Sequence, residues 1–198
     1  VIMVWTIGKR LYAAAGALLA VLLVTAGVSL YALSDVNEEV KGITGRTAVA
    51  LKLSGRIQYL IADLRASTRL QIIASERKDL ATIEAKVKEN DAEFKELVDA
   101  TEELQTLTAV QEIKDLAKET RAQMEDWEKL ATKVEDAARK FAFEEAIAIN
   151  DQAKVFSTKA EESAQKIFDI ETEKLKTDAE TADATYRQVR FEMLLFVG

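Results

Sequence analysis

Apolar and small side chains recur along most of the chain at alternating steps of three and four residues, which is the spacing of one face of an α-helix. The first such row lies between residues 36 and 71 and consists of Val36, Val40, Ile43, Thr47, Ala50, Ser54, Ile57, Ile61, Leu64, Thr68 and Gln71. It predicts a long helix, softened but not broken by Gly42, Gly45 and Gly55. The polar segment from Ser75 to Asp79 should end this helix, with Asp79 as the N-cap of the next one.

Three further rows of the same spacing follow this predicted turn. They are Leu80, Ile83, Val87, Asn90, Phe94, Leu97, Thr101 and Leu104; then Val110, Ile113, Ala117, Thr120, Met124, Trp127, Ala131, Val134 and Ala138; then Phe156, Ala160, Ala164, Ile167, Glu171, Lys174, Asp178, Ala182, Tyr186 and Val189. A capping box from Thr108 to Gln111 should start the third helix. Four antiparallel helices joined by short turns predict an all-α, up-down-up-down four-helix bundle over residues 34–190.

Residues 11–33 form an uninterrupted stretch without a charged side chain. At about 1.5 Å per residue this stretch is about 34 Å long as a helix, enough to cross a hydrocarbon core of about 30 Å. A signal peptide is the alternative, but its apolar region is shorter, and here the helical spacing continues outward. We therefore expect a transmembrane helix over 11–33, and a second one beginning within 191–198.

Lys9 and Arg10 directly precede the apolar stretch, whereas the next charges after it are acidic. Basic residues mark the cytoplasmic flank of a membrane segment. Residues 1–10 are thus predicted to be cytoplasmic and the bundle to lie outside the cell membrane. Because the first and last helices are longer than the middle pair, a second copy should cover their membrane-proximal part as a parallel homodimer. The alternative is a monomer with a loosely packed stalk.

The composition excludes much catalytic chemistry. The 198 residues contain no His, no Cys and no Pro, so the usual zinc, haem and iron–sulfur ligands and Cys or His catalysis are absent. We therefore expect no metal, no cofactor, no catalytic residue and no enzymatic activity. The net charge of -7 disfavours nucleic-acid binding. Phe94, Met124 and Trp127 occupy apolar rows and are predicted to be core residues.

Several segments together resemble a known family. The basic N-terminal segment before the membrane stretch, its end at Ser29–Leu33, the acidic start of a long helix, and the segment Glu144–Ile149 after a basic-aromatic turn are similar to the four-helix-bundle sensor modules of methyl-accepting chemotaxis proteins, the bacterial chemoreceptors. The resemblance covers almost the whole chain. It implies a module that signals ligand occupancy across the bacterial inner membrane, with the bundle facing the periplasm. The same modules occur on histidine kinases and diguanylate cyclases, and a stalk without a ligand is a third possibility.

The resemblance also implies a ligand site near the membrane-distal end of the first helix. In aspartate-type relatives, arginines there hold a ligand carboxylate between two subunits, and this chain has Arg65 and Arg69 one helical turn apart, with Thr68 between them. Two guanidinium groups on one face can clamp a carboxylate, and a hydroxyl can add a donor. Alternatively, both arginines pair with acidic neighbours or are solvated.

The expected ligand is a small extracellular molecule, such as a carboxylate or amino acid, or a periplasmic binding protein. Contributions from the fourth helix are predicted to come from the level of Asn150, Gln152 and Thr158.

Overall fold

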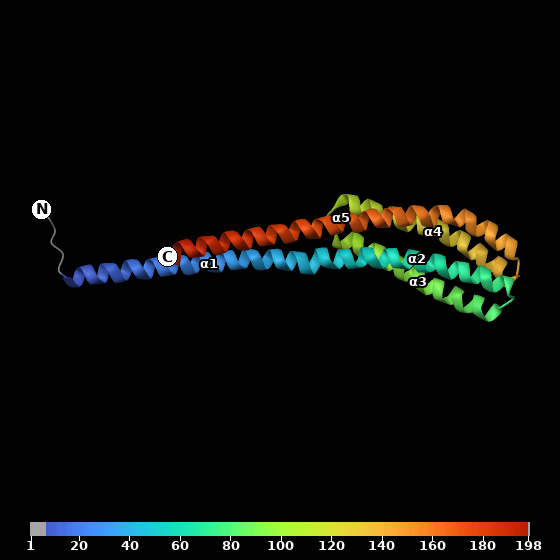
Figure 1. Cartoon of the computed structure of the whole chain (residues 1–198), viewed down its shortest axis with the longest axis horizontal. Helices are drawn as coiled ribbons and strands as arrows, with labels where there is room; N and C mark the ends of the chain where they lie inside the picture. The colour runs from blue at the N-terminus through green and yellow to red at the C-terminus, as the bar shows by residue number, and fades with distance from the viewer. Residues whose placement is uncertain (1–6, 198) are drawn as a thin grey trace. The chain divides into compact units, whose positions relative to one another are not determined.

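The structure, a computed structural model, describes residues 7–197, and these form helices joined by short turns. In order they are α1 (Ile7–Gly42), a π-helical turn (Ile43–Thr47), α2 (Ala48–Glu76), α3 (Leu80–Leu107), α4 (Gln111–Arg139) and α5 (Phe143–Val197). No strand occurs in this range, which confirms the all-α class (Figure 1). Residues 1–6 and Gly198 lie outside the described residues, so the expected cytoplasmic segment 1–10 is described only from Ile7 onward.

The chain divides into two compact units. One unit spans residues 44–175 and contains α2, α3, α4 and the first part of α5. The other unit contains α1 and the last part of α5, from Lys176 onward. The bundle expected over 34–190 contains the whole of the first unit and extends beyond it at both ends.

The first unit is a four-helix bundle whose helices alternate in direction (Figure 1). Helix α2 packs against α3 and α4, and α3 packs against α4, while α5 adds small side chains to the same core. The largest fully buried apolar side chains are Ile57, Leu60, Ile61, Leu64, Ile83, Leu97, Leu104, Ile113, Met124 and Ile167. The helical spacing of the sequence thus identified the buried faces.

The first predicted row is buried where it lies inside the bundle, and it is exposed or half-buried on the N-terminal side of the bundle. Every position of the first row from Thr47 to Gln71 is buried, whereas Val36 is half-buried and Val40 is exposed. Met124 and Trp127 are core residues as expected, and Phe94 is half-buried against the same core cluster. The rows therefore predict burial only where all four helices are present to pack around them.

Two turns at one end of the bundle have the same backbone design. After α2 the amide of Asp79 donates to the carbonyl of Ala74 at 2.9 Å, and the amide of Lys78 donates to that of Ser75 at 3.1 Å. This is a Schellman motif, in which the residue after the C-cap adopts a left-handed conformation, and Lys78 has φ 58°. The turn after α4 repeats both hydrogen bonds, with Phe141 at φ 56°.

The start of α3 follows the prediction and the start of α4 does not. Asp79 caps α3 by accepting a hydrogen bond from the Thr82 amide at 3.1 Å. The capping box predicted from Thr108 to Gln111 is wrong, because the N-cap of α4 is Val110, without a side-chain cap, and Gln111 is the first helical residue. The Thr108 hydroxyl instead accepts from the Val110 amide at 3.2 Å, which closes the short connection between the helices.

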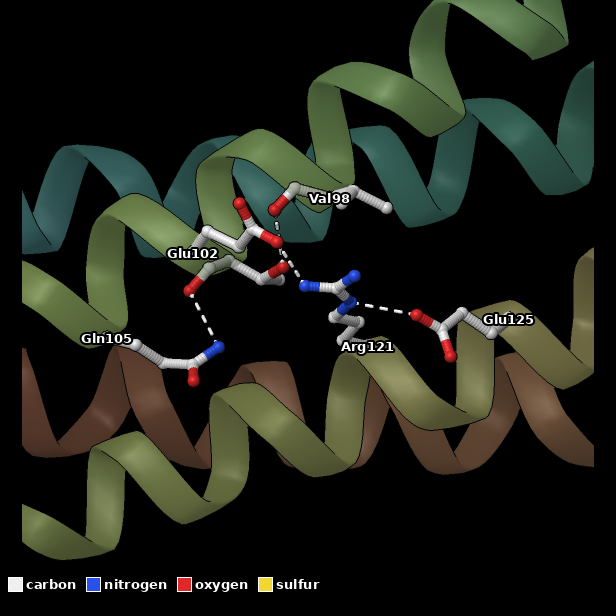
Figure 2. A network of polar contacts seen from close by, with 6 residues as sticks. Val98, Glu102, Gln105, Arg121 and Glu125 are labelled. Atoms are coloured by element: carbon white, nitrogen blue, oxygen red, sulfur yellow. Dashed lines mark hydrogen bonds and ion pairs between the residues drawn. The ribbon is translucent and has the colours of Figure 1, made fainter.

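Beyond this connection, polar contacts fasten α3 to α4. Figure 2 shows Arg121 of α4 reaching Glu102 of α3, while its Nε donates to Glu125 on its own helix at 2.8 Å. Nearby, Gln105 donates to the carbonyl of Thr101 at 3.2 Å. These side chains are partly exposed, so the ion pairs contribute little beyond about 1 kcal/mol each.

The π-helical turn interrupts the regular α-helix between α1 and α2. Such a turn holds one residue more than an α-turn and is rare outside single insertions. Gly42 and Gly45 lie at it, and a Cβ on either would have no neighbour within 4 Å. The chain stays helical through these glycines, as predicted. The hydrogen-bonding pattern nevertheless changes there from α-helical to π-helical.

In the other unit, α1 has the length and composition of a membrane span. Within the described residues, one stretch is long and apolar enough to cross a membrane, Leu11–Val28, and none of its residues is buried. Exposed apolar side chains are the arrangement expected of a helix that is surrounded by lipid. The second membrane helix expected from 191–198 stays a prediction.

Lys78 should respond to replacement by Gly. An L-residue with φ near 60° is disfavoured, whereas Gly adopts this conformation freely. We expect Lys78→Gly to raise the free energy of unfolding by about 0.5–1 kcal/mol, measured by thermal unfolding followed by circular dichroism. The control Lys88→Gly, at an exposed interior position of α3, should lower it by about 1 kcal/mol. Equal destabilisation by both changes would contradict the role assigned to the turn.

Candidate ligand-binding site

Arg65 and Arg69 lie on one face of α2, next to α5. Together with Trp127 of α4 they line a small pocket that α5 closes with Asn150, Lys154 and Ser157. Arg65 is mostly covered, with 20% of its side chain exposed, and pairs with Glu161 of α5. Arg69 is exposed and forms no ion pair among the described residues. The structure thus brings both predicted arginines together and matches one alternative for Arg65, pairing with an acidic neighbour.

Thr68 does not face this pocket. It is 1% exposed, and its hydroxyl donates to the carbonyl of Leu64 at 2.9 Å. Its oxygen also accepts from the amide of Asn90 on α3 at 3.4 Å. Because one residue of helix turns the side chain by about 100°, the position between the two arginines points into the core. The Thr68 hydroxyl is therefore not a donor on the face of Arg65 and Arg69.

Of the three α5 residues expected at this level, Asn150 lines the pocket. Gln152 is exposed, and Thr158 lines a different surface hollow with Glu161 and Glu162. Sequence reasoning missed Lys154 and Ser157. Both lie on one helical face with Asn150, at steps of four and three residues, so the spacing rule applied to polar side chains would have found them.

The pocket carries a positive charge and has little free space. Arg65, Arg69 and Lys154 contribute three cations at its rim, and Glu161 offsets one of them. The cavity volume is about 20 Å³, which admits about one water molecule. The guanidinium of Arg69 is exposed at this pocket, whereas that of Arg65 is held in the ion pair with Glu161.

The core beside the pocket contains several polar side chains. Gln71 of α2 is 0% exposed, and among the described residues neither atom of its amide has a hydrogen-bond partner. The hydroxyls of Ser67 and Ser75 on the same helix are also buried without a partner. Such groups cost stability when they are left unsatisfied. This end of the bundle therefore contributes less to the stability of the fold than the Leu- and Ile-rich part of the core does.

A pair of carboxyl groups links α2 to α3. Burial raises the pKa of Glu93 to about 7, and a hydrogen bond with Asp63 and the negative charges of Asp63 and Glu89 add to this shift, while Lys86 opposes it. Because this pKa lies near neutrality, the Glu93 carboxyl holds a proton over part of the neutral pH range.

No arrangement of metal ligands accompanies these carboxyl groups. Among the described residues, no group of three or more His, Cys, Asp or Glu side chains is placed to hold a metal ion.

Comparison with known proteins assigns the chain to a family. Residues 4–186 match the family described as a four helix bundle sensory module for signal transduction. The chain belongs to this family of sensory modules. No curated protein and no solved structure matches the chain significantly.

The family assignment confirms the resemblance to the sensor modules of methyl-accepting chemotaxis proteins. Together with the apolar helix Leu11–Val28, it indicates that the chain is membrane-associated.

The raised pKa of Glu93 predicts how stability depends on pH. Because the pKa of Glu93 is higher in the folded state than its ordinary value of 4.5, the folded chain binds more protons than the unfolded chain between about pH 4.5 and 7. The free energy of unfolding should therefore fall as pH rises through this window. Glu93→Gln should reduce this slope and make the protein more stable than wild type at pH 8, as measured by denaturant unfolding.

The slope should be reduced rather than abolished, because burial also raises the pKa of Glu135 to about 7. The matched control is Glu103→Gln, at an exposed position of the same helix, and it should leave the slope unchanged. A Glu93→Gln slope equal to that of wild type would show that folding does not raise the pKa of Glu93.

Proposed function

We propose that this chain is the ligand-binding module of a transmembrane chemoreceptor, in which Arg65, Arg69 and Lys154 hold a carboxylate of a small extracellular molecule. The observation that carries the proposal is the convergence of these three cations from α2 and α5 on one pocket. Guanidinium groups bind carboxylates through two parallel hydrogen bonds, and Asn150 supplies a further neutral donor. The module performs no catalysis in this proposal and acts alone or through a ligand-loaded periplasmic binding protein.

The signal would be a difference between two packings of α5 against α2. Arg65 pairs with Glu161 of α5, and Gln58 of α2 donates to Gln165 of α5 at 3.1 Å. A carboxylate that competes with Glu161 for Arg65 would weaken one of these connections. A ligand shifts such an equilibrium only by its difference in affinity for the two states, about 1–3 kcal/mol in ordinary coupling.

The proposed location is the bacterial inner membrane, with the bundle on the periplasmic side and a membrane helix at each end. The basic pair Lys9 and Arg10 before Leu11–Val28 supports this orientation through the excess of basic residues on cytoplasmic flanks. A sensory family and an apolar helix are consistent with it.

The working unit in this proposal is a parallel homodimer formed through α2. Besides its buried face, α2 has a second row of apolar or small side chains that is exposed: Tyr59, Ala62, Ala66, Leu70 and Ile73. The steps between them are three or four residues, so they form one stripe. Small residues at its centre allow two helices to approach closely, and Arg69 lies beside the stripe, next to Leu70. A partner packed there would bring a second pair of arginines to the site.

Substitution of the arginines tests the ligand site. Arg65→Ala and Arg69→Ala should each weaken binding of a carboxylate ligand by about 10- to 100-fold, because each removes one charge-assisted hydrogen bond. Calorimetric titration with a panel of dicarboxylates and amino acids measures the affinity. The control Arg56→Ala removes an arginine of the same helix that pairs with Glu96 of α3 at 2.7 Å, away from the pocket, and should leave affinity unchanged. A ligand that binds the wild type and both variants equally well would remove the arginines from the site.

Cysteine cross-linking tests the dimer and its orientation. The chain has no Cys, so Ala62→Cys and Ala66→Cys each introduce a single thiol on the proposed interface. At least one of them should form a disulfide-linked dimer in membranes under mild oxidation, since parallel helices packed through small residues bring symmetry-related positions within disulfide reach. The control Glu119→Cys, at an exposed position of α4, should not cross-link. Monomer from both α2 variants would contradict the interface.

The Glu119→Cys variant also reports the side of the membrane. In cells with a permeabilised outer membrane, its thiol should react with a membrane-impermeant maleimide. Labelling only after lysis would place the bundle in the cytoplasm and reverse the proposed orientation.

A further inference from the structure

A second pocket lies between α3 and α4, and its chemistry is opposite to that of the arginine pocket. Its walls include Asn90 and Asp91 of α3 together with Trp127, Glu128 and Glu135 of α4. None of the described residues that line it is basic. Trp127 lines both pockets, so one side chain borders a cationic site and an acidic one.

The acidic groups of this pocket lack a full counter-charge. Glu135 is only 8% exposed, and burial, followed by the negative charge of Asp91, raises its pKa to about 7. The same two effects, with Glu125, raise the pKa of Glu128. Arg139 lowers the pKa of Glu135, but its guanidinium is already held by Glu84 at 2.9 Å.

A buried neutral acceptor also faces this pocket. Asn90 is 4% exposed, and its amide nitrogen donates to Thr68 at 3.4 Å, while its Oδ1 has no hydrogen-bond partner among the described residues. A buried acceptor left unpaired costs free energy that a donor in the pocket would recover. The side chain of Asn90 also lowers the pKa of Glu135 through a hydrogen bond, but its Oδ1 stays without a partner and indicates a ligand that donates hydrogen bonds.

The aromatic walls and the size of the pocket narrow the choice of ligand. Phe94 and Trp127 are among its lining residues, and aromatic rings attract cations through their π faces. The cavity volume is about 30 Å³, which is enough for one or two water-sized groups. An ammonium group has about this size, carries a positive charge and donates only N–H hydrogen bonds.

We propose that this pocket between α3 and α4 binds a small protonated amine, either ammonium or the ammonium head of a primary amine. The N–H groups would donate to the Oδ1 of Asn90 and to the carboxylate of Glu135, with Asp91 and Glu128 at the mouth contributing charge. A metal ion is a poorer candidate, because the described acidic groups are not arranged as metal ligands. The proposal stands independently of the carboxylate site, since the two pockets share only Trp127.

The test uses the full chain in lipid nanodiscs, with Trp5→Phe as background so that Trp127 is the remaining tryptophan. Ammonium chloride and methylammonium chloride should change the Trp127 emission saturably. Potassium chloride and tetramethylammonium chloride at equal ionic strength should not, because neither cation has an N–H donor. An equal response to potassium or tetramethylammonium would overturn the proposal, as would no saturable response to ammonium.

Substitutions locate the binding. Glu135→Gln and Asp91→Asn should each weaken ammonium binding at least about tenfold, since each removes a charged acceptor or a neighbouring charge. Circular dichroism shows whether each variant is folded. If Glu135→Gln does not fold, the Asp91→Asn variant still tests the site, because Asp91 is exposed. The matched control Glu119→Gln, at an exposed position of α4, should bind ammonium as the wild type does. Unchanged affinity in a folded Asp91→Asn or Glu135→Gln protein would overturn the assignment of the pocket.

Discussion

The bundle depends on the burial of one face of α2 against the other three helices. Ile57, Leu60, Ile61 and Leu64 are all 0% exposed, and full burial of such a side chain is worth about 1.5–3 kcal/mol relative to exposure. Helix α5 meets this face with small residues, among them Ala153, Ala160 and Ala164. Large side chains on one helix and alanines on the facing one allow close packing without voids. The spacing between α2 and α5, and hence the width of the arginine pocket, follows from this pairing.

The buried polar residues of α2 are concentrated in the last part of this helix. Towards the end with the two Schellman turns, α2 replaces its large apolar side chains by Ser67, Thr68, Gln71 and Ser75, all buried. A core with unsatisfied polar groups has a smaller packing advantage over alternative arrangements than a purely apolar one. The proposed function requires a change between two packings, and such a region favours it, because a fully optimised core would hold one arrangement too strongly to be shifted by a ligand.

Trp127 connects the two charged environments of the bundle. It is 2% exposed and borders the cations Arg65, Arg69 and Lys154 on one side and the acidic pocket of α3 and α4 on the other. Because packed side chains do not deform continuously, a displacement of one wall of this buried indole would also move the other. The two proposed ligands would therefore act on the same helix packing.

The helical spacing of apolar residues determined the fold class, the number of helices in the bundle and most of its buried positions, because a 3.6-residue period is a local property of the chain. It also located the first turn, since Asp79 is a local cap. The sequence did not determine the start of α4, where the backbone geometry of the connection, and not the Thr and Gln pattern, decides which amide the Thr108 hydroxyl meets.

The two pockets and the direction of Thr68 were decided only by the tertiary structure. The spacing placed Arg65 and Arg69 on one face. Which residues of α5 lie opposite depends on the register between two distant helices, since Arg65 and its partner Glu161 are 96 residues apart in the chain. The raised pKa values of Glu93 and Glu135 arise from burial and from charges on neighbouring helices. Those are properties of packing between distant segments, and a local pattern carries no record of them.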